Sequence, residues 1–172
     1  MDRVVLRELD IRPCAGCWHC WVKTPGRCAT HDDSEAIRRR WRHADLVIFA
    51  SPMSMGFVHS RLKMLVDRFI PLVHPYATVQ HGESMHLDRY EDLPPLAVLV
   101  RPGSGDSEID VQITVDWMAR VAEHMRRPLV FAAVEGVVMD EVGRAVDAHF
   151  ADPIPWVPLE RQRPGAVPLV SS

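Results

Sequence analysis

Lysine is nearly absent from this 172-residue chain: of its 20 basic side chains, only Lys23 and Lys63 are lysines. The bias toward arginine is better explained by the base composition of a genome than by chemistry. Acidic residues number 23, which gives a net charge of −3. This balance does not favour binding to nucleic acid or to an anionic membrane surface.

Long apolar runs are also missing. No stretch approaches the roughly 20 apolar residues that cross a bilayer, and the start, Met-Asp-Arg-Val-Val, lacks the apolar core of a signal peptide. We therefore expect a cytoplasmic protein that is not bound to a membrane. The composition, 47% hydrophobic and 25% charged, is ordinary for a globular protein. The length predicts a single domain over residues 1–172.

Cysteine is confined to one stretch, which we define as the cysteine loop, residues 14–33. Its four cysteines follow the pattern C-x2-C-x2-C-x7-C, and they are Cys14, Cys17, Cys20 and Cys28. Four thiolates in so short a span are the ligand set of an iron–sulfur cluster or of a tetrahedral zinc ion. The crowding of three cysteines favours iron–sulfur over zinc, because zinc sites usually separate two C-x2-C pairs. Free thiols, a pair of disulfides and a zinc knuckle stay open as alternatives, although a cytoplasmic location disfavours disulfides.

Strand and helix signals alternate along the rest of the chain. Runs of β-branched and apolar residues predict strands over 4–9, 44–51, 96–101 and 129–134. Apolar stripes at helical spacing predict helices over 34–42, 60–70, 107–125 and 140–150. This order predicts an α/β fold with a doubly wound parallel sheet in three layers.

Ligands of such sheets bind at the carboxyl ends of the strands. Two glycine-containing segments lie there: Ser51–Gly56 after the second predicted strand, and Pro102–Asp106 after the third. Residues 71–94 are predicted to form a long loop. We expect its histidines to be solvated or part of a lid, and not to be metal ligands. Residues 151–172 are predicted to be an extended tail.

Two motifs together resemble a known family. The cysteine loop reads C-A-G-C-W-H-C…P-G-R-C-A-T-H-D-D, and the segment after the second strand reads S-P-M-S-M-G…L-K…D-R. Both are similar to motifs of the flavodoxin-like NADPH-dependent FMN reductases and of their relatives, the iron–sulfur flavoproteins. The resemblance covers residues 4–68, and beyond them it extends only to topology.

The resemblance implies a flavin site and a cluster site. FMN would be held by two loops, whose residues are Ser51, Pro52, Met53, Ser54, Met55 and Gly56 in the first and Pro102, Gly103, Ser104 and Gly105 in the second. The same cysteines, Cys14, Cys17, Cys20 and Cys28, would hold a [4Fe–4S] cluster. Lys63, Asp67 and Arg68 would be structural or lie at a dimer interface. NAD(P)H would be the electron donor, and no side chain is nominated as catalytic.

The resemblance also has a gap. Family members open with a strand and a phosphate-binding loop, whereas Val4–Leu9 matches their second strand. Two arrangements could repair the sheet: the second and third strands could pair directly, or the tail, residues 166–172, could supply the central strand. Pro168 disfavours the second arrangement, because proline is rare in central strands.

Two functions follow from these observations. The first is an FMN-dependent NAD(P)H oxidoreductase that passes electrons to a small-molecule acceptor or a redox partner protein. The alternative is a truncated, non-catalytic flavodoxin-like module with a metal-binding cysteine loop; a zinc-stabilised binding domain has little support beyond the cysteines. In either case we expect a homo-oligomer, because an incomplete sheet leaves an edge to cover.

Overall fold

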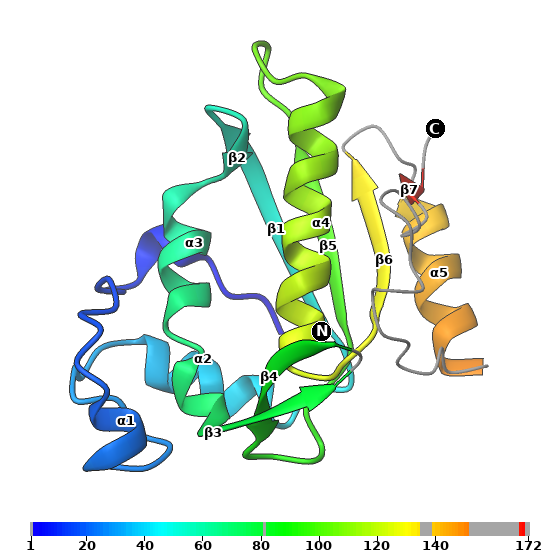
Figure 1. Ribbon diagram of the computed structural model, residues 1–172. Helices are drawn as coiled ribbons and strands as arrows, with labels where there is room; N and C mark the ends of the chain where they lie inside the picture. Colours follow the sequence, from blue (N-terminus) through cyan, green and yellow to red (C-terminus); the bar gives the residue numbers. More distant parts are fainter. Residues whose placement is uncertain (1, 81, 135–138, 152–168, 171–172) are drawn as a thin grey trace. The chain divides into compact units, whose positions relative to one another are not determined.

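A computed structural model describes residues 2–80, 82–134, 139–151 and 169–170 (Figure 1). The chain divides into two compact units, Met1–Ala44 with Ser60–Leu93, and Asp45–His59 with Pro94–Ser172. The single domain over residues 1–172 stays a prediction. Within the described ranges, no helix is long and apolar enough to cross a membrane.

The second unit contains a five-stranded sheet in the order β2-β1-β5-β6-β7. The strands are β1 (Val47–Ser54), β2 (Phe57–Val58), β5 (Leu96–Arg101), β6 (Leu129–Val134) and β7 (Leu169–Val170). The β1–β5, β5–β6 and β6–β7 pairs are parallel, whereas β2 is antiparallel to β1. Figure 1 shows β1, β5 and β6 side by side. The predicted α/β, flavodoxin-like fold is confirmed, and β5 and β6 have their predicted bounds.

The core of this unit explains why its strands are continuously apolar. Five side chains of β5 and β6 have no exposed surface, and they are Leu96, Ala97, Val98, Ala132 and Ala133. Helices α4 (Glu108–His124) and α5 (Met139–Ala151) both contact β6. Helix α4 buries Val115 and Met118 completely, as its predicted apolar stripe requires. Parallel strands covered in this way lose the alternation of polar and apolar residues.

The first flavin motif is more regular than predicted. We expected Ser51–Gly56 to be a loop, but β1 continues through Ser54 and turns back into β2, with Ser54 paired to Phe57. The two turn residues, Met55 and Gly56, have φ angles of +56° and +77°. Two positive φ angles define a type I′ turn, whose twist matches that of a hairpin. The motif is therefore a strand end and a tight hairpin.

The first unit holds the remaining elements. They are η1 (Leu6–Glu8), α1 (His19–Val22), α2 (Ser34–Trp41), α3 (Ser60–Asp67), η2 (Ile70–Leu72), β3 (Val73–Gln80) and β4 (Glu83–Asp88). Our strand over residues 4–9 is wrong, since the segment forms the 3₁₀ turn η1. No described strand lies alongside to receive its ladder hydrogen bonds. The local bonds from Glu8 N–H to Val5 O, at 3.1 Å, and from Leu9 N–H to Leu6 O, at 3.3 Å, replace them.

The predicted long loop over residues 71–94 is also corrected. Strands β3 and β4 form an antiparallel hairpin there, with Gly82 at a φ of +83° in its turn. Histidine, tyrosine and proline made the segment look irregular, but Pro75 lies where the strand register shifts between Val73 and Ala77. An irregularity is the place where a strand tolerates proline.

Neither predicted repair of the sheet is present. Residues 4–9 form the turn η1 and no strand, and the tail forms a strand at a different place. Leu169 and Val170 pair with Ala132 and Ala133 of β6, at the sheet edge opposite β2. The tail strand therefore extends the sheet beyond β6 and does not fill its centre. The other predicted tail residues, 152–168 and 171–172, lie outside the described ranges.

Candidate functional site

The two predicted flavin segments follow neighbouring strands. Strands β1 and β5 run parallel in register, with Pro52 paired to Arg101. The type I′ turn and residues 102–105 therefore leave the sheet at the same edge. Ser51 and Met53 are buried, whereas Pro52, Ser54 and Met55 are exposed, because β1 alternates its side chains between two faces. Met55 is 99% exposed. Sequence alone could not separate the buried members from the exposed ones.

A single carboxylate, which the motifs did not predict, joins the two segments. The Gly56 N–H donates to Asp106 Oδ1 at 2.9 Å, and the Gly103 N–H donates to Asp106 Oδ2 at 2.6 Å. Asp106 ends the glycine-containing segment Pro102–Asp106 but was not among the residues predicted to bind flavin, and its position in that segment was its only signal. The Asp106 carboxylate thus connects the two predicted segments in the structure.

Glycine keeps the backbone accessible in the second segment. A Cβ at Gly103 would lie 3.3 Å from Asp106 Oδ2 and 3.7 Å from Met53 O, and at Gly105 it would meet nothing within 4 Å. Gly103, Ser104 and Gly105 are exposed. Exposed backbone on two adjoining strand ends is what a flat ring bound through main-chain groups requires. The residues present therefore match the requirements of an isoalloxazine ring.

The second candidate site is the cysteine loop, which belongs to the first unit. Gly16 and Trp18 have φ angles of +62° and +58° and redirect the chain between its first cysteines. The short helix α1 then follows, and Trp18 stacks on Trp21 with ring centroids 4.8 Å apart. The Trp21 indole N–H donates to Ile70 O and Val73 O, which fixes the loop to its own unit.

All four cysteines are free thiols. Cys20 is buried, Cys17 is exposed, and the other two are partly buried. Burial raises the pKa of the Cys20 thiol, and the charges of Cys28, Cys14 and Cys17 raise it further. The disulfide alternative is therefore not seen, and the other three thiols lie near enough to influence Cys20.

The thiols match an iron–sulfur centre in kind and number but not in arrangement. Throughout the part of the chain that the structure describes, no three metal-ligating side chains are placed to hold an ion. The predicted set Cys14, Cys17, Cys20 and Cys28 gathers loosely around Cys20. The structure therefore shows a donor set without a formed coordination site.

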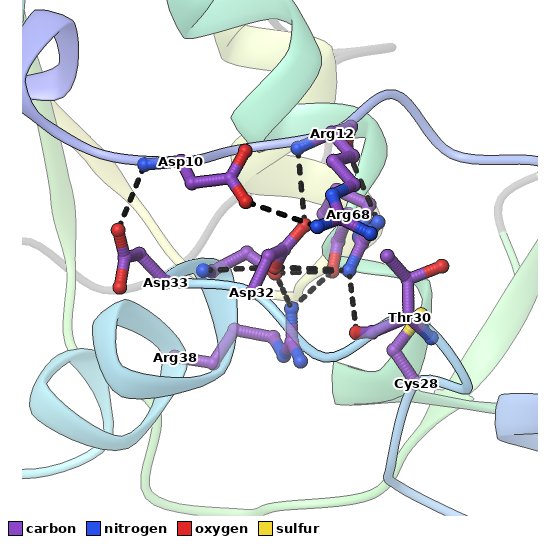
Figure 2. Close-up of polar contacts among 9 residues, drawn as sticks. Asp10, Arg12, Cys28, Thr30, Asp32, Asp33, Arg38 and Arg68 are labelled. Carbon is purple, nitrogen blue, oxygen red and sulfur yellow. Dashed lines mark hydrogen bonds and ion pairs between the residues drawn. The ribbon is translucent and has the colours of Figure 1, made fainter.

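A buried network of arginines and carboxylates fixes the carboxyl-terminal end of the cysteine loop (Figure 2). Arg68, only 1% exposed, is its centre. Its Nη2 donates to Thr30 O, Asp32 Oδ1 and Ser34 Oγ, each at 3.1 Å. Its Nη1 donates to Arg12 O at 3.2 Å. Arg68 is therefore a structural residue of this unit.

Two buried arginines, Arg38 and Arg68, belong to the network. Arg38 donates to Ser34 Oγ at 2.9 Å and to Arg68 O at 3.2 Å, and it is 5% exposed. Burial lowers the pKa of Arg38, and the charge of Arg68 lowers it further, whereas a charge on Cys28 would raise it. Both guanidinium groups stay protonated, as arginines do in proteins, and Arg68 pairs with the fully buried carboxylate of Asp32. The charge of Arg38 lies near enough to Cys28 for the two groups to interact.

The Asp32 carboxylate is held in its charged form. Burial alone would raise its pKa, but hydrogen bonds from Ser34 and the Arg12 N–H, together with the charge of Arg68, bring the pKa below its usual value. At the surface, the Asp33 carboxylate accepts a hydrogen bond from the Asp10 N–H at 2.8 Å. The Asp32-Asp33 pair of the cysteine motif therefore ties helix α2 to the segment before the loop.

Comparison with known proteins agrees with these two motifs. The chain is 39% identical over 69 residues to an iron–sulfur flavoprotein of Methanocaldococcus jannaschii, an alignment that covers 40% of this chain and 35% of that protein. It is 34% identical over 71 residues to an iron–sulfur flavoprotein of Methanosarcina thermophila, covering 41% of this chain and 36% of that protein. The chain thus matches about a third of the length of these curated relatives.

The family itself is shown by a broader match. The profile of the NADPH-dependent FMN reductases matches residues 1–86, half of the 172 residues. This range contains the cysteine loop and the β1–β2 hairpin but not the second glycine segment. The paired loops at the carboxyl edge of the sheet and this match lead to one conclusion: the chain belongs to the NADPH-dependent FMN reductase family.

Proposed function

We propose that the chain binds FMN and acts as an FMN-dependent NAD(P)H oxidoreductase. The observation that carries the proposal is the junction of Ser51–Gly56 and Pro102–Gly105 at the carboxyl edge of two neighbouring parallel strands. This edge is where open α/β sheets bind their ligands. Membership in the family supports the same cofactor.

The protein's own contribution would be positioning. Bound FMN would supply the hydride and electron chemistry, and the protein would orient the ring and set its electronics. Main-chain groups of the two segments would hold the ring, with the exposed Pro52, Ser54 and Met55 beside it. NAD(P)H is the proposed donor. A small molecule or a redox partner protein is the proposed acceptor, and no side chain needs to act as a general base.

The cysteine loop is proposed to hold a [4Fe–4S] cluster. Four free thiols in 15 residues supply the ligand type and number. The positive charge of Arg38, which lies near enough to interact with Cys28, would favour the negative charge of a thiolate-ligated centre. Two curated relatives carry the name iron–sulfur flavoprotein and align over part of this chain.

A non-catalytic module is the second candidate. Along β1, residues Val47–Pro52 pair with β5 on one side, and on the other side no described strand pairs with them. The predicted central strand with its phosphate loop would lie there. Without a phosphate site, FMN would bind weakly, and the chain would act as a subunit. A second copy of the chain is the proposed partner for this edge.

Anaerobic purification followed by a visible spectrum, with iron, zinc and acid-labile sulfide assayed on the same sample, tests the proposal. We expect a two-banded flavin spectrum and FMN-dependent NAD(P)H oxidation. We also expect iron and sulfide that are lost when Cys14, Cys17, Cys20 and Cys28 are all replaced by serine. A chain that stays colourless after incubation with FMN would refute the oxidoreductase and leave the module. Zinc without sulfide would refute the cluster.

A further inference from the structure

We propose that Asp106 is the positioning residue of the flavin site: its carboxylate holds the β1–β2 turn and the Pro102–Gly105 segment in one arrangement before a ligand binds. The proposal rests on the proposed function above. It adds a residue that neither flavin motif contains.

The contacts of Asp106 divide between the two segments. Oδ1 accepts the Gly56 N–H at 2.9 Å, and Oδ2 accepts the Gly103 N–H at 2.6 Å. The backbone N–H of Asp106 also donates to Gly103 O at 3.1 Å, which closes a turn within the second segment. Hydrogen bonds to a carboxylate are stronger than those between neutral groups. One side chain therefore fixes both segments at once.

Capping of helix α4 does not account for this carboxylate. The helix begins with a capping box in which the Ser107 N–H donates to Asp110 Oδ2 at 2.7 Å and the Asp110 N–H donates to Ser107 Oγ at 3.3 Å. The first orphan N–H groups of the helix are thus satisfied without Asp106. Its two oxygens serve the segments that precede the helix.

The segments need such a connection because glycine makes them costly to order. A glycine loses more conformational freedom on folding than any other residue, and the second segment contains Gly103 and Gly105. If the two segments moved independently, ligand binding would have to align them. A site aligned in advance avoids that loss, and the apparent dissociation constant scales inversely with the aligned fraction.

The coupling also decides which main-chain groups remain for a ligand. The N–H groups of Gly56 and Gly103 are committed to Asp106. A flavin would therefore hydrogen-bond to other main-chain groups of the two segments.

Amide hydrogen exchange of the full chain, measured by NMR without FMN, tests the coupling directly. In Asp106→Ala, we expect the amides of Gly56 and Gly103 to exchange at least about tenfold faster, and to change together, because both lose their acceptor. Asp106→Asn keeps one acceptor oxygen and should accelerate only one of them strongly. Asp116→Asn is the matched control: it removes a carboxylate of α4 that accepts from the Gln112 amide at 2.8 Å. Unchanged exchange at both glycines in Asp106→Ala would overturn the proposal.

FMN affinity, measured by quenching of flavin fluorescence, tests the positioning role. We expect the dissociation constant to rise about tenfold or more in Asp106→Ala, as if the aligned fraction fell to about a tenth, and less in Asp106→Asn. Asp116→Asn should bind as the wild type does. Equal affinity in wild type and Asp106→Ala would overturn the role. If the wild type binds no FMN, the proposed function fails and this role fails with it, while exchange still decides the coupling. If Asp106→Ala loses its far-ultraviolet circular dichroism, Asp106→Asn decides both tests.

Discussion

Arg68 Nη2 lies 3.1 Å from Asp32 Oδ1, and both side chains are almost completely withdrawn from solvent (Figure 2). The two residues are 36 positions apart in the sequence, yet both belong to the first unit. The pair joins helix α3's end to the end of the cysteine loop. Its burial makes it sensitive to the loss of either partner.

Arg68→Met tests how much this network contributes to the stability of the fold. The substitution leaves the Asp32 carboxylate buried without its cation, so we expect the free energy of unfolding to fall by about 3–5 kcal/mol. Urea denaturation measures the change. Lys63→Met is the matched control, because Lys63 pairs with Asp67 at the surface. An exposed pair contributes about 0–1 kcal/mol. Similar losses in the two variants would contradict the prediction.

Acid stability should depend on Asp32. The folded-state pKa of Asp32 is depressed, so its stabilising contribution is present above the unfolded pKa of about 3.9. That contribution is lost as the pH falls through the lower, folded pKa. We therefore expect the urea midpoint of the wild type to fall as the pH drops below about 4. The fall should be shallower in Asp32→Asn, and parallel curves for the two proteins would refute this assignment.

Met55 offers a test of stored strain. Its φ of +56° is unfavourable for a residue with a long side chain, and that side chain is 99% exposed. Asparagine tolerates this conformation better and is preferred in type I′ turns. Met55→Asn should therefore raise the free energy of unfolding by about 0.5–1 kcal/mol, which is a melting-temperature increase of about 1–4 °C for a chain of this size.

Met55→Leu is the control for this substitution, because it keeps an apolar side chain and the strain. If Met55→Asn is no more stable than Met55→Leu, the strain is not there. FMN affinity of the same variants separates stability from function. A more stable Met55→Asn with weaker flavin binding would show that the exposed methionine side chain contributes to the site.

The elements that could be predicted are those whose own residues form a recognisable pattern of apolar or capping residues. Strands β5 and β6 are short, continuous apolar runs, and Ser107 marks the start of α4. Their environment is set by burial, which the pattern of side chains records. The residues 4–9 have an equally strong β composition, but a strand also needs a neighbour, and composition carries no information about one.

The sequence indicated the segments of the candidate site but not the side chains that connect them. The motifs predicted two flavin segments from their glycine and proline residues, and the structure places both at one edge of the sheet. Asp106 was missed because an aspartate before a helix ordinarily reads as a cap. The Arg68 network was missed for a similar reason: a lone arginine on an amphipathic helix ordinarily lies at the surface. In both cases, contacts between residues distant in the sequence decided the role.

At Gly56, both the backbone conformation of the turn and the packing around it require glycine. Its φ is +77°, and a Cβ there would lie 2.9 Å from Asp110 Oδ1 and 3.2 Å from Asp110 Cγ. Asp110 cannot retreat freely, because its carboxylate accepts from Ser107 in the capping box. Gly56→Ala should therefore lower the free energy of unfolding by about 1–3 kcal/mol.

Gly143→Ala gives the opposite expectation and serves as the matched control for Gly56→Ala. Gly143 lies within helix α5, and a Cβ there would meet nothing within 4 Å. Replacing an unstrained helical glycine with alanine should raise the free energy of unfolding by about 0.5–1 kcal/mol. Urea denaturation of the two variants, side by side, measures both changes. Because the same methyl group is added in each, a loss of stability in Gly56→Ala alone reports the turn and its contact with Asp110. A Gly56→Ala variant as stable as the wild type would show that the β1–β2 turn does not need glycine.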